Sequence, residues 1–218
     1  MIIFEFERVL LNTTLLKEDI KQVFEKFEIE GQDFWKSFYH SYDLDYKELG
    51  SYSIDRHLNL LKNLTKGQRA AIKRDVEIAV LNRGRGYLYP DVVEFLSQLR
   101  ERQIKMVLLS QGNASFQKLK LEATGMKEYF DTIIIFNNSL ATILKRLIVP
   151  KSEHAIVYIG KKISRLKDIR RKYPFITIFY IRRENQSPPQ DLAVGSIFSL
   201  NELSWCLRTL SPKKLKRS

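Results

Sequence analysis

Two carboxylates stand at the end of the first apolar run of the chain. Residues 2–6 are almost wholly apolar, which predicts a short buried strand, and Glu5 and Glu7 lie one residue apart at its carboxyl end. A carboxylate is costly to desolvate unless it is paired or binds a ligand. Such groups can act as a nucleophile, as a general acid or base, or as ligands of a hard cation such as Mg²⁺. Acidic residues also close strand ends without a function, and this alternative stays open.

The elements that must position these carboxylates alternate along the chain. The expected strands are residues 1–6, 104–109, 132–136, 155–159, 175–181 and 196–198, and the expected helices of this part are 90–102, 114–124, 139–147, 163–172 and 201–209. Such alternation predicts an α/β fold, with a Rossmann-like parallel sheet covered by helices on both faces. Ligands in these folds bind beyond the carboxyl ends of the strands, where Glu5 and Glu7 stand.

Between the first strand and Pro90 the pattern is helical. Helical spacing of apolar residues predicts four helices, and Ser51 or Ser53 is a plausible N-cap of the third; the helices are 15–28, 32–43, 52–64 and 66–82. Gly84 and Gly86 interrupt the pattern and fit a hinge better than a nucleic-acid-binding RG pair. The predicted organisation is a core of residues 1–13 and 88–210, an inserted helical cap of 14–87 and a basic tail of 211–218.

Residues 1–13 resemble the first motif of the haloacid dehalogenase-like (HAD) hydrolase superfamily. In that motif a nucleophilic aspartate and a second aspartate follow a strand, and a glycine comes next. In this chain both aspartates are replaced, by Glu5 and Glu7, and Arg8 takes the place of the glycine. The resemblance covers nearly the whole chain and implies a phosphatase fold with an altered reactive centre. A misplacement of a reacting group by about 1 Å can cost roughly 10²-fold in rate, so the longer glutamate disfavours ordinary turnover.

Residues 106–112 resemble the second motif of the family, an apolar strand that ends in Ser or Thr. The resemblance implies that the hydroxyl of Ser110 binds a phosphoryl group, with the backbone N–H groups of Gln111 and Gly112 beside it. Taken alone, Ser110 fits a helix N-cap equally well.

Residues 156–160 resemble the strand and glycine of the fourth motif, whose acids complete a Mg²⁺ site in the family. Here Lys161 takes the place of the first acid, and Arg165 stands near the place of the second. The two positive charges would neutralise Glu5 and Glu7, and an ammonium among the carboxylates would repel a metal ion. We therefore expect no bound metal and no cofactor. The third-motif lysine has no clear counterpart, since Lys145 and Lys151 both fit solvent-facing positions.

An aromatic stripe lies in the second predicted helix of the cap. Trp35, Phe38, Tyr39 and Tyr42 recur at helical spacing. This pattern is typical of a cap core, and the alternative is a surface that contacts a substrate or partner.

Charge is concentrated in one segment. The net charge is +12, and residues 161–183 hold nine basic groups and one acid. This favours a phosphorylated or acidic partner, although a basic helix can also be a solvated face. The single cysteine, Cys206, fits a reducing cytosol, and no apolar run reaches the roughly 18 residues of a membrane span. A cytoplasmic location is therefore expected.

Three functions compete. We expect a HAD-like protein that has lost phosphatase activity and acts as a binding or regulatory protein for a phosphorylated or acidic ligand, using Ser110 and Lys161. The first alternative is an atypical HAD-family phosphatase, with Glu5 as nucleophile or base and Glu7 as general acid or base; only this alternative calls for Mg²⁺. The second alternative is a module that binds nucleic acid or acidic partners through residues 161–183, with a steep dependence on salt.

Overall fold

The computed structural model describes residues 1–48, 52–137, 139–148, 155–183 and 195–204, without the side chains of 42–48. Ser51, Lys151, Cys206 and the basic tail of 211–218, on which predictions were made, lie outside these residues, as does the side chain of Tyr42. No helix of the described part is long and apolar enough to cross a membrane, in agreement with the sequence.

The core is a six-stranded sheet in which every pair of neighbouring strands is parallel, so the predicted fold class is confirmed. The strands stand in the order β3-β2-β1-β4-β5-β6, and they are β1 (Ile2–Glu5), β2 (Met106–Gln111), β3 (Thr132–Phe136), β4 (Val157–Gly160), β5 (Thr177–Ile181) and β6 (Gly195–Ile197). The order reverses at β1, which pairs with β2 on one side and β4 on the other. The switch point, where such folds bind ligands, therefore lies at the carboxyl ends of β1 and β4.

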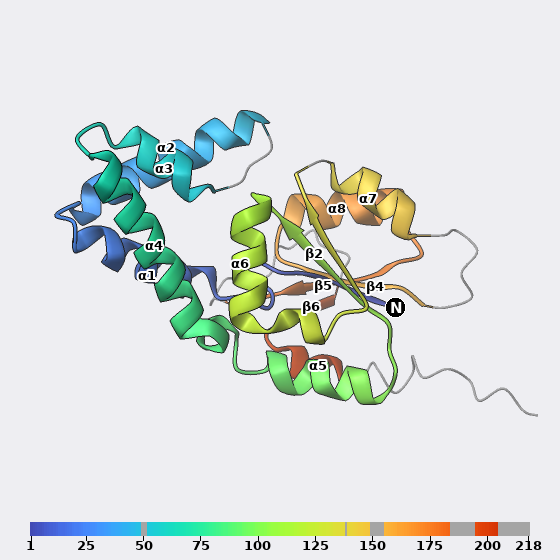
Figure 1. Cartoon of the computed structure of the whole chain (residues 1–218). Helices are drawn as coiled ribbons and strands as arrows, with labels where there is room; N and C mark the ends of the chain where they lie inside the picture. Colours follow the sequence, from blue (N-terminus) through green and yellow to red (C-terminus); the bar gives the residue numbers. More distant parts are fainter. Residues whose placement is uncertain (49–51, 138, 149–154, 184–194, 205–218) are drawn as a thin grey trace, which may run out of the picture.

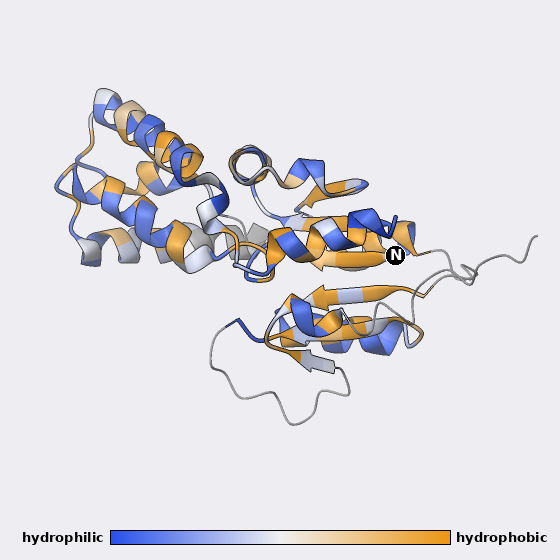
Figure 2. Ribbon diagram, turned by 90° about the horizontal axis from the view of Figure 1, so that it is seen from below, coloured by the Kyte–Doolittle hydropathy of each residue, from blue (hydrophilic) through white to orange (hydrophobic). Residues whose placement is uncertain are grey.

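Helices cover both faces of the sheet (Figure 1), and they are α5 (Val92–Glu101), α6 (Ala114–Thr124), α7 (Leu140–Leu147) and α8 (Ile163–Lys172). Because side chains alternate along a strand, β1 feeds two cores. Ile2 and Phe4 belong to the core that also contains residues of α5 and α6, whereas Ile3 belongs to the core under α7 and α8. Figure 2 shows these strands as largely hydrophobic ribbons.

The sequence misplaced some element ends. The strand expected over 104–109 runs over Met106–Gln111 instead, because Ser110 and Gln111 continue the parallel pairing with β3. Ser110 is thus part of the strand and not a helix N-cap; Asn113 caps α6. Of the helix expected over 201–209, the described part is a 3₁₀ turn, η3 (Leu200–Leu203).

The residues between β1 and α5 form a helical segment, defined here as residues 13–83. Its helices are α1 (Thr13–Glu25), α2 (Gly31–Glu48), α3 (Ile54–Leu60) and α4 (Lys66–Arg83), and Figure 1 shows them together to one side of the sheet. Asn12 caps α1 and Ser53 caps α3. The helix α3 is shorter than expected and ends where Leu61 has an extended backbone conformation. Arg69 donates to the carbonyl oxygens of Leu58 and Leu61, which the end of the helix leaves open.

Two chain passages join the helical segment to the core. They run side by side, since Leu11 forms an antiparallel bridge with Leu88 and the N–H of Asn12 donates to the Tyr87 carbonyl (2.7 Å). Between α4 and this passage lies a 3₁₀ turn, η1 (Gly84–Tyr87). The residues Arg83–Gly86, weighed above as a hinge or an RG pair, thus lie where the helical segment joins the core.

Both arginines of this pair are engaged within the protein. Arg83 pairs with Asp19 (2.9 Å) and Arg85 with Glu128 (3.4 Å). These contacts join the passage to α1 and to the core, which favours a structural role over nucleic-acid binding.

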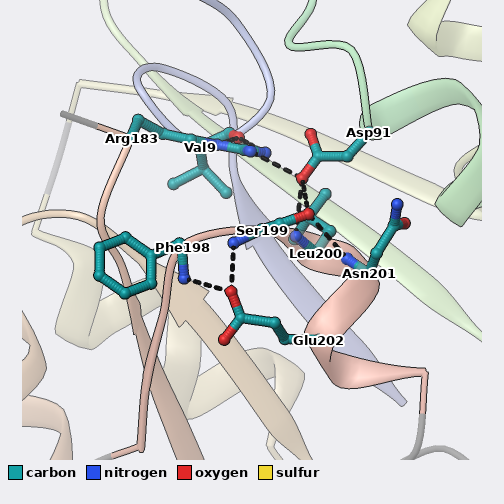
Figure 3. A network of polar contacts seen from close by, with 8 residues as sticks. All are labelled: Val9, Asp91, Arg183, Phe198, Ser199, Leu200, Asn201 and Glu202. Atoms are coloured by element: carbon teal, nitrogen blue, oxygen red, sulfur yellow. Dashed lines mark hydrogen bonds and ion pairs between the residues drawn. The ribbon is translucent and has the colours of Figure 1, made fainter. Parts of the chain in front are cut away.

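A partly buried polar network contacts the loop that follows β1 (Figure 3). Arg183 donates to the Val9 carbonyl and to Oδ2 of Asp91, and that same oxygen accepts from Ser199 and Leu200. The network thereby ties the end of β5 and η3 to the loop that follows β1.

Candidate functional site

Glu5 is buried at the end of β1, with 6% of its surface exposed. Its Oε1 accepts from the Tyr158 hydroxyl and from Nη1 of Arg165, both at 2.8 Å, and its Oε2 accepts from the backbone N–H of Lys161 at 3.0 Å. Gly160 permits this close approach, since a Cβ there would lie 3.0 Å from the Glu5 carboxyl carbon. The carboxylate is therefore bound on both oxygens by β4 and α8.

Arg165 supplies the cation that faces Glu5. A second guanidinium nitrogen, Nη2, donates to the side chain of Gln111, so that α8 is joined to both β1 and β2. Burial lowers the pKa of this guanidinium, but the Glu5 charge more than offsets the effect, and the pKa is raised above its usual value. Burial first, and the Glu5 charge next, also raise the pKa of Tyr158. The tyrosine therefore remains a hydrogen-bond donor and the arginine a permanent cation.

Glu7 lies just beyond β1, and its carboxylate is partly exposed. Its Oε1 is 2.8 Å from the ammonium of Lys120 and 3.3 Å from Oγ of Ser110. Lys120 comes from α6, is only 4% exposed, and has its ammonium 5.1 Å from the centre of the Phe116 ring. The Ser110 hydroxyl has a shorter contact with Oε1 of Gln117, at 2.8 Å. Because a hydroxyl has one proton, it donates to only one of these oxygens at a time.

The turn after β2 is also engaged within the protein. The N–H of Gly112 donates to the Phe136 carbonyl (3.0 Å), and the side-chain amide of Gln117 donates to the carbonyl of Gln111 (2.8 Å). Gly112 has a φ of +146°, and a Cβ there would lie 2.4 Å from the Gln117 amide nitrogen, so glycine is required. The Gly112 N–H, for which phosphate binding was expected, is directed into the sheet.

The side chain of Lys161 is buried beside Tyr180. Its ammonium lies 5.3 Å from the centre of the Tyr180 ring, and its backbone N–H donates to Glu5. The positive charges beside Glu5 and Glu7 come from Arg165 and Lys120. Of the two cations expected from the sequence, Arg165 contacts Glu5 through its side chain, and the cation that contacts Glu7 is Lys120, from a different helix.

Arg8 occupies the place of the family's glycine and has a backbone conformation that favours glycine. Its φ is +60°, in the left-handed region. Its N–H donates to the Leu11 carbonyl at 2.9 Å, within the loop that leads to the helical segment. Arg8 is therefore a side-chain-bearing residue at a position whose backbone conformation suits glycine.

A cavity of about 290 Å³ lies between the helical segment and the core, at the carboxyl end of β1. The core contributes Glu7, Gln111 and three residues of α6, and the helical segment contributes residues of α1 and α2; its lining residues are Glu7, Arg8, Thr13, Leu16, Lys17, Ile20, Phe38, Tyr39, Tyr52, Gln111, Phe116, Gln117 and Lys120. Glu5 is not among them. Of the two motif carboxylates, only Glu7 is available to a molecule in this cavity.

The residues present do not fit a Mg²⁺ ion. Magnesium requires near-octahedral oxygen ligation, usually from carboxylates and water. Glu5 is instead bound to a guanidinium and Glu7 to an ammonium, both at 2.8 Å. In the described part of the chain, no group of three or more His, Cys, Asp or Glu residues is placed to hold a metal ion.

The comparisons with known proteins agree with this fold. The model of the haloacid dehalogenase-like hydrolase family matches residues 3–148, and the chain belongs to this family. A HAD phosphatase from Thermococcus onnurineus has a similar structure, with a TM-score of 0.63 and 20% identity, covering 97% of this chain and 99% of that one. CbbY from Rhodobacter sphaeroides, solved in complex with phosphate, gives 0.57 and 13%, covering 93% and 95%.

The magnesium-bound HAD-hydrolase YfnB from Bacillus subtilis is also similar, with a TM-score of 0.62 and 13% identity, covering 94% of this chain and 97% of that one. No curated protein matches the sequence. At these identities the solved structures support the fold alone.

The sequence reasoning missed two residues of the site, Lys120 and Tyr158. Lys120 shares the buried face of α6 with Phe116, Gln117 and Thr124, at helical spacing. A lysine on an otherwise buried helix face is rarely without a partner, but the burial of this face is known only from the structure. Tyr158 lies in the middle of an apolar strand, where a buried hydroxyl also needs a partner.

Proposed function

We propose that this HAD-family protein has lost phosphatase activity and acts as a binding or regulatory protein for a phosphorylated or acidic ligand. The observation that carries the proposal is the environment of Glu5, the residue at the place of the nucleophile. Both of its oxygens accept hydrogen bonds from the protein, it is 6% exposed, and it does not line the cavity. A nucleophile must approach the reacting phosphorus atom to about 3–3.5 Å, and Glu5 is held away from any such atom.

The ligand site in this proposal is the cavity between the helical segment and the core. Among the described residues, its lining contains the cationic side chains of Arg8, Lys17 and Lys120 and the carboxylate of Glu7, which pairs with Lys120. Cationic side chains in a cavity favour an anionic ligand. The sequence predicted that Lys161 contacts the anionic ligand, but Lys161 does not line the cavity. In this proposal Arg8 and Lys17 contact the ligand instead.

Hydrolysis of 4-nitrophenyl phosphate, with and without Mg²⁺, tests the loss of activity. We expect no turnover by the wild type or by Glu5→Gln, and no effect of Mg²⁺. Metal-dependent turnover that Glu5→Gln abolishes would overturn the proposal and establish the atypical phosphatase. In that case Glu5 would have to leave the contacts with Arg165 and Tyr158 to react.

Binding of inorganic phosphate, followed by calorimetry, tests the ligand part. We expect Lys120→Met to weaken binding, because it removes a positive charge from the cavity and leaves Glu7 unpaired there. Lys118→Met is the matched control, since Lys118 is exposed on the same helix and does not line the cavity. Equal binding by the two variants would place the anion elsewhere.

The exposed basic side chains of α8 favour a second candidate function, the binding of nucleic acid or an acidic protein. These side chains are Lys167, Arg170, Arg171 and Lys172. Binding of a nucleic acid or acidic protein to this surface would weaken steeply with salt and would not respond to Lys120→Met.

A further inference from the structure

The cavity between the helical segment and the core has two chemically different parts. Its polar part contains Glu7, Lys120 and Gln117, next to the end of β1. Its other part is aromatic and contains Phe38, Tyr39, Tyr52 and Phe116. A site for a small aliphatic phosphate has no need of the aromatic part.

The aromatic rings are held in fixed mutual positions. Phe38 and Tyr52 are stacked at 4.7 Å with an interplanar angle of 28°, and Tyr52 meets Phe116 edge to face at 5.3 Å. The second contact crosses from the helical segment to α6 of the core. Tyr52 is fixed further by its hydroxyl, which lies 3.0 Å from Nδ1 of the buried His57. Rigid aromatic walls of this kind favour flat rings, which stack on or against them.

Tyr39 is the aromatic residue that a ligand meets first. It is 55% exposed although it lines the cavity, and it stacks on Trp35 at 5.8 Å. Of the aromatic stripe noted in the sequence, Phe38 is buried in the core of the helical segment, and Tyr39 is directed to the cavity and to solvent.

Positive charge is interleaved with the rings. The ammonium of Lys17 lies 5.3 Å from the centre of the Phe38 ring, and that of Lys120 lies 5.1 Å from the centre of Phe116. An anionic group bound by these ammoniums would therefore be carried by a molecule whose neighbouring atoms touch aromatic rings. We infer that the cavity binds an organic anion whose charged group is attached to, or close to, an aromatic ring. This inference rests on the proposed function and narrows its ligand class.

Four probes of matched size separate the ring from the charge. Binding of phenyl phosphate, butyl phosphate, benzoate and benzyl alcohol is measured by calorimetry on the full chain. We expect phenyl phosphate to bind at least about fivefold more tightly than butyl phosphate, which has the charge without the ring, since stacking on an aromatic side chain contributes roughly 1–3 kcal/mol. Benzyl alcohol, which has the ring without the charge, should bind more weakly than either anion with a ring. The comparison of benzoate with phenyl phosphate distinguishes a carboxylate from a phosphate ligand.

Two substitutions in the cavity lining test whether the probes bind in this cavity. Tyr39→Ser should reduce phenyl phosphate binding towards that of butyl phosphate and leave butyl phosphate unchanged, whereas Lys17→Gln should weaken both phosphates by a similar factor of several-fold. The matched controls are Phe175→Ser, at an aromatic residue 53% exposed outside the cavity, and Lys26→Gln, at an exposed lysine of the helical segment. Both controls should bind as the wild type does, and urea unfolding verifies that all variants are folded.

The outcomes separate this inference from the proposed function. Equal affinity for phenyl and butyl phosphate would overturn the aromatic preference and leave an anion-binding protein. Phenyl phosphate binding that neither Tyr39→Ser nor Lys17→Gln changes would overturn the assignment to this cavity. Release of phenol from phenyl phosphate would refute the loss of activity, and a lower KM for phenyl than for butyl phosphate would then still support the aromatic site.

Discussion

The guanidinium of Arg165 lies 2.8 Å from the carboxylate of Glu5 and joins α8 to the end of the central strand. The family resemblance implies carboxylates around a metal ion at this place, whereas here a guanidinium faces Glu5. A guanidinium is always charged, so it neutralises the Glu5 carboxylate within the fold. In this structure the carboxylate of Glu5 is thereby part of the internal packing of the protein.

Removing either partner of this pair should destabilise the protein. We expect Arg165→Met to lower the free energy of unfolding by about 2–3 kcal/mol, because it leaves Glu5 buried without its cation. This loss is smaller than that for a fully buried pair, because the Arg165 side chain is 21% exposed and partly screened by water. The double variant with Glu5→Gln should lose less than the sum of the single losses, since neither charge then remains unpaired. Urea unfolding gives these values.

The matched control is Arg171→Met on the same helix. Arg171 pairs with Asp168 at the surface, where both side chains are at least 70% exposed, and such pairs contribute little. Equal losses for Arg165→Met and Arg171→Met would contradict the structural role of the Glu5 pair.

Arg8 should be replaceable by glycine but not by a β-branched residue. At a φ of +60°, a residue with a Cβ is strained by about 1–2 kcal/mol, and glycine is not. We expect Arg8→Gly to leave the free energy of unfolding unchanged or to raise it slightly. Arg8→Val should lower it by about 1–2 kcal/mol relative to the glycine variant. Similar unfolding midpoints for the two variants would show that this backbone conformation is not maintained in solution.

The stability of the helical segment should depend on pH through His57. This histidine is fully buried, with Nε2 2.8 Å from Oγ of Ser37, and burial lowers its pKa to about 4 from 6.5. The neutral form therefore stabilises the fold above about pH 6.5, and this contribution is lost as the pH falls towards about 4. In that range His57 should reduce the free energy of unfolding by up to about 1.4 kcal/mol per pH unit.

Urea unfolding at several pH values between roughly 3.5 and 7.5, a range that brackets the two pKa values, measures this slope. In His57→Gln the slope of the free energy of unfolding against pH should be smaller by the contribution of about one proton, roughly 1.4 kcal/mol per pH unit. The exposed His40 provides the control, since His40→Gln should follow the wild type. Parallel curves for wild type and His57→Gln would show that His57 is not buried in its neutral form.

The parallel sheet and most element positions could be predicted because they depend on local pattern. Apolar runs alternate with amphipathic segments, and only a βαβ arrangement buries both. Arg165 could also be placed near the glutamates, because it lies one helical turn beyond the end of β4. Lys120 could not, because its contact with Glu7 depends on how α6 packs across the sheet edge.

The direction of the Lys161 side chain could not be predicted from the sequence either, because it also depends on packing. Successive residues after a strand point in different directions, and only the packed structure shows that its side chain turns towards Tyr180. The position of Arg165 beside Glu5 was therefore predictable, while the contact of Lys120 with Glu7 and the direction of the Lys161 side chain were not.

The network around Asp91 should be required both for stability and for the geometry of the cavity. Oδ2 of Asp91 accepts from Arg183 (2.7 Å), Ser199 (2.8 Å) and Leu200 (2.7 Å), and Arg183 also donates to the Val9 carbonyl (2.7 Å). Burial alone would raise the pKa of Asp91, but Arg183 and the other donors more than offset it, so its pKa is lowered. The stabilisation is therefore present above the usual carboxyl range and is lost as the pH falls through the lowered pKa.

We expect Asp91→Asn to lower the free energy of unfolding by about 3 kcal/mol at neutral pH, because Arg183 remains buried without its anion. Asp168→Asn, which breaks a surface pair, should change it by less than about 0.5 kcal/mol. Because Arg183 holds Val9, which follows Arg8 in the loop before the helical segment, Asp91→Asn should also weaken phosphate binding at pH 7 under conditions where it remains folded. Unchanged phosphate affinity in folded Asp91→Asn would mean that the network stabilises the fold without positioning the cavity.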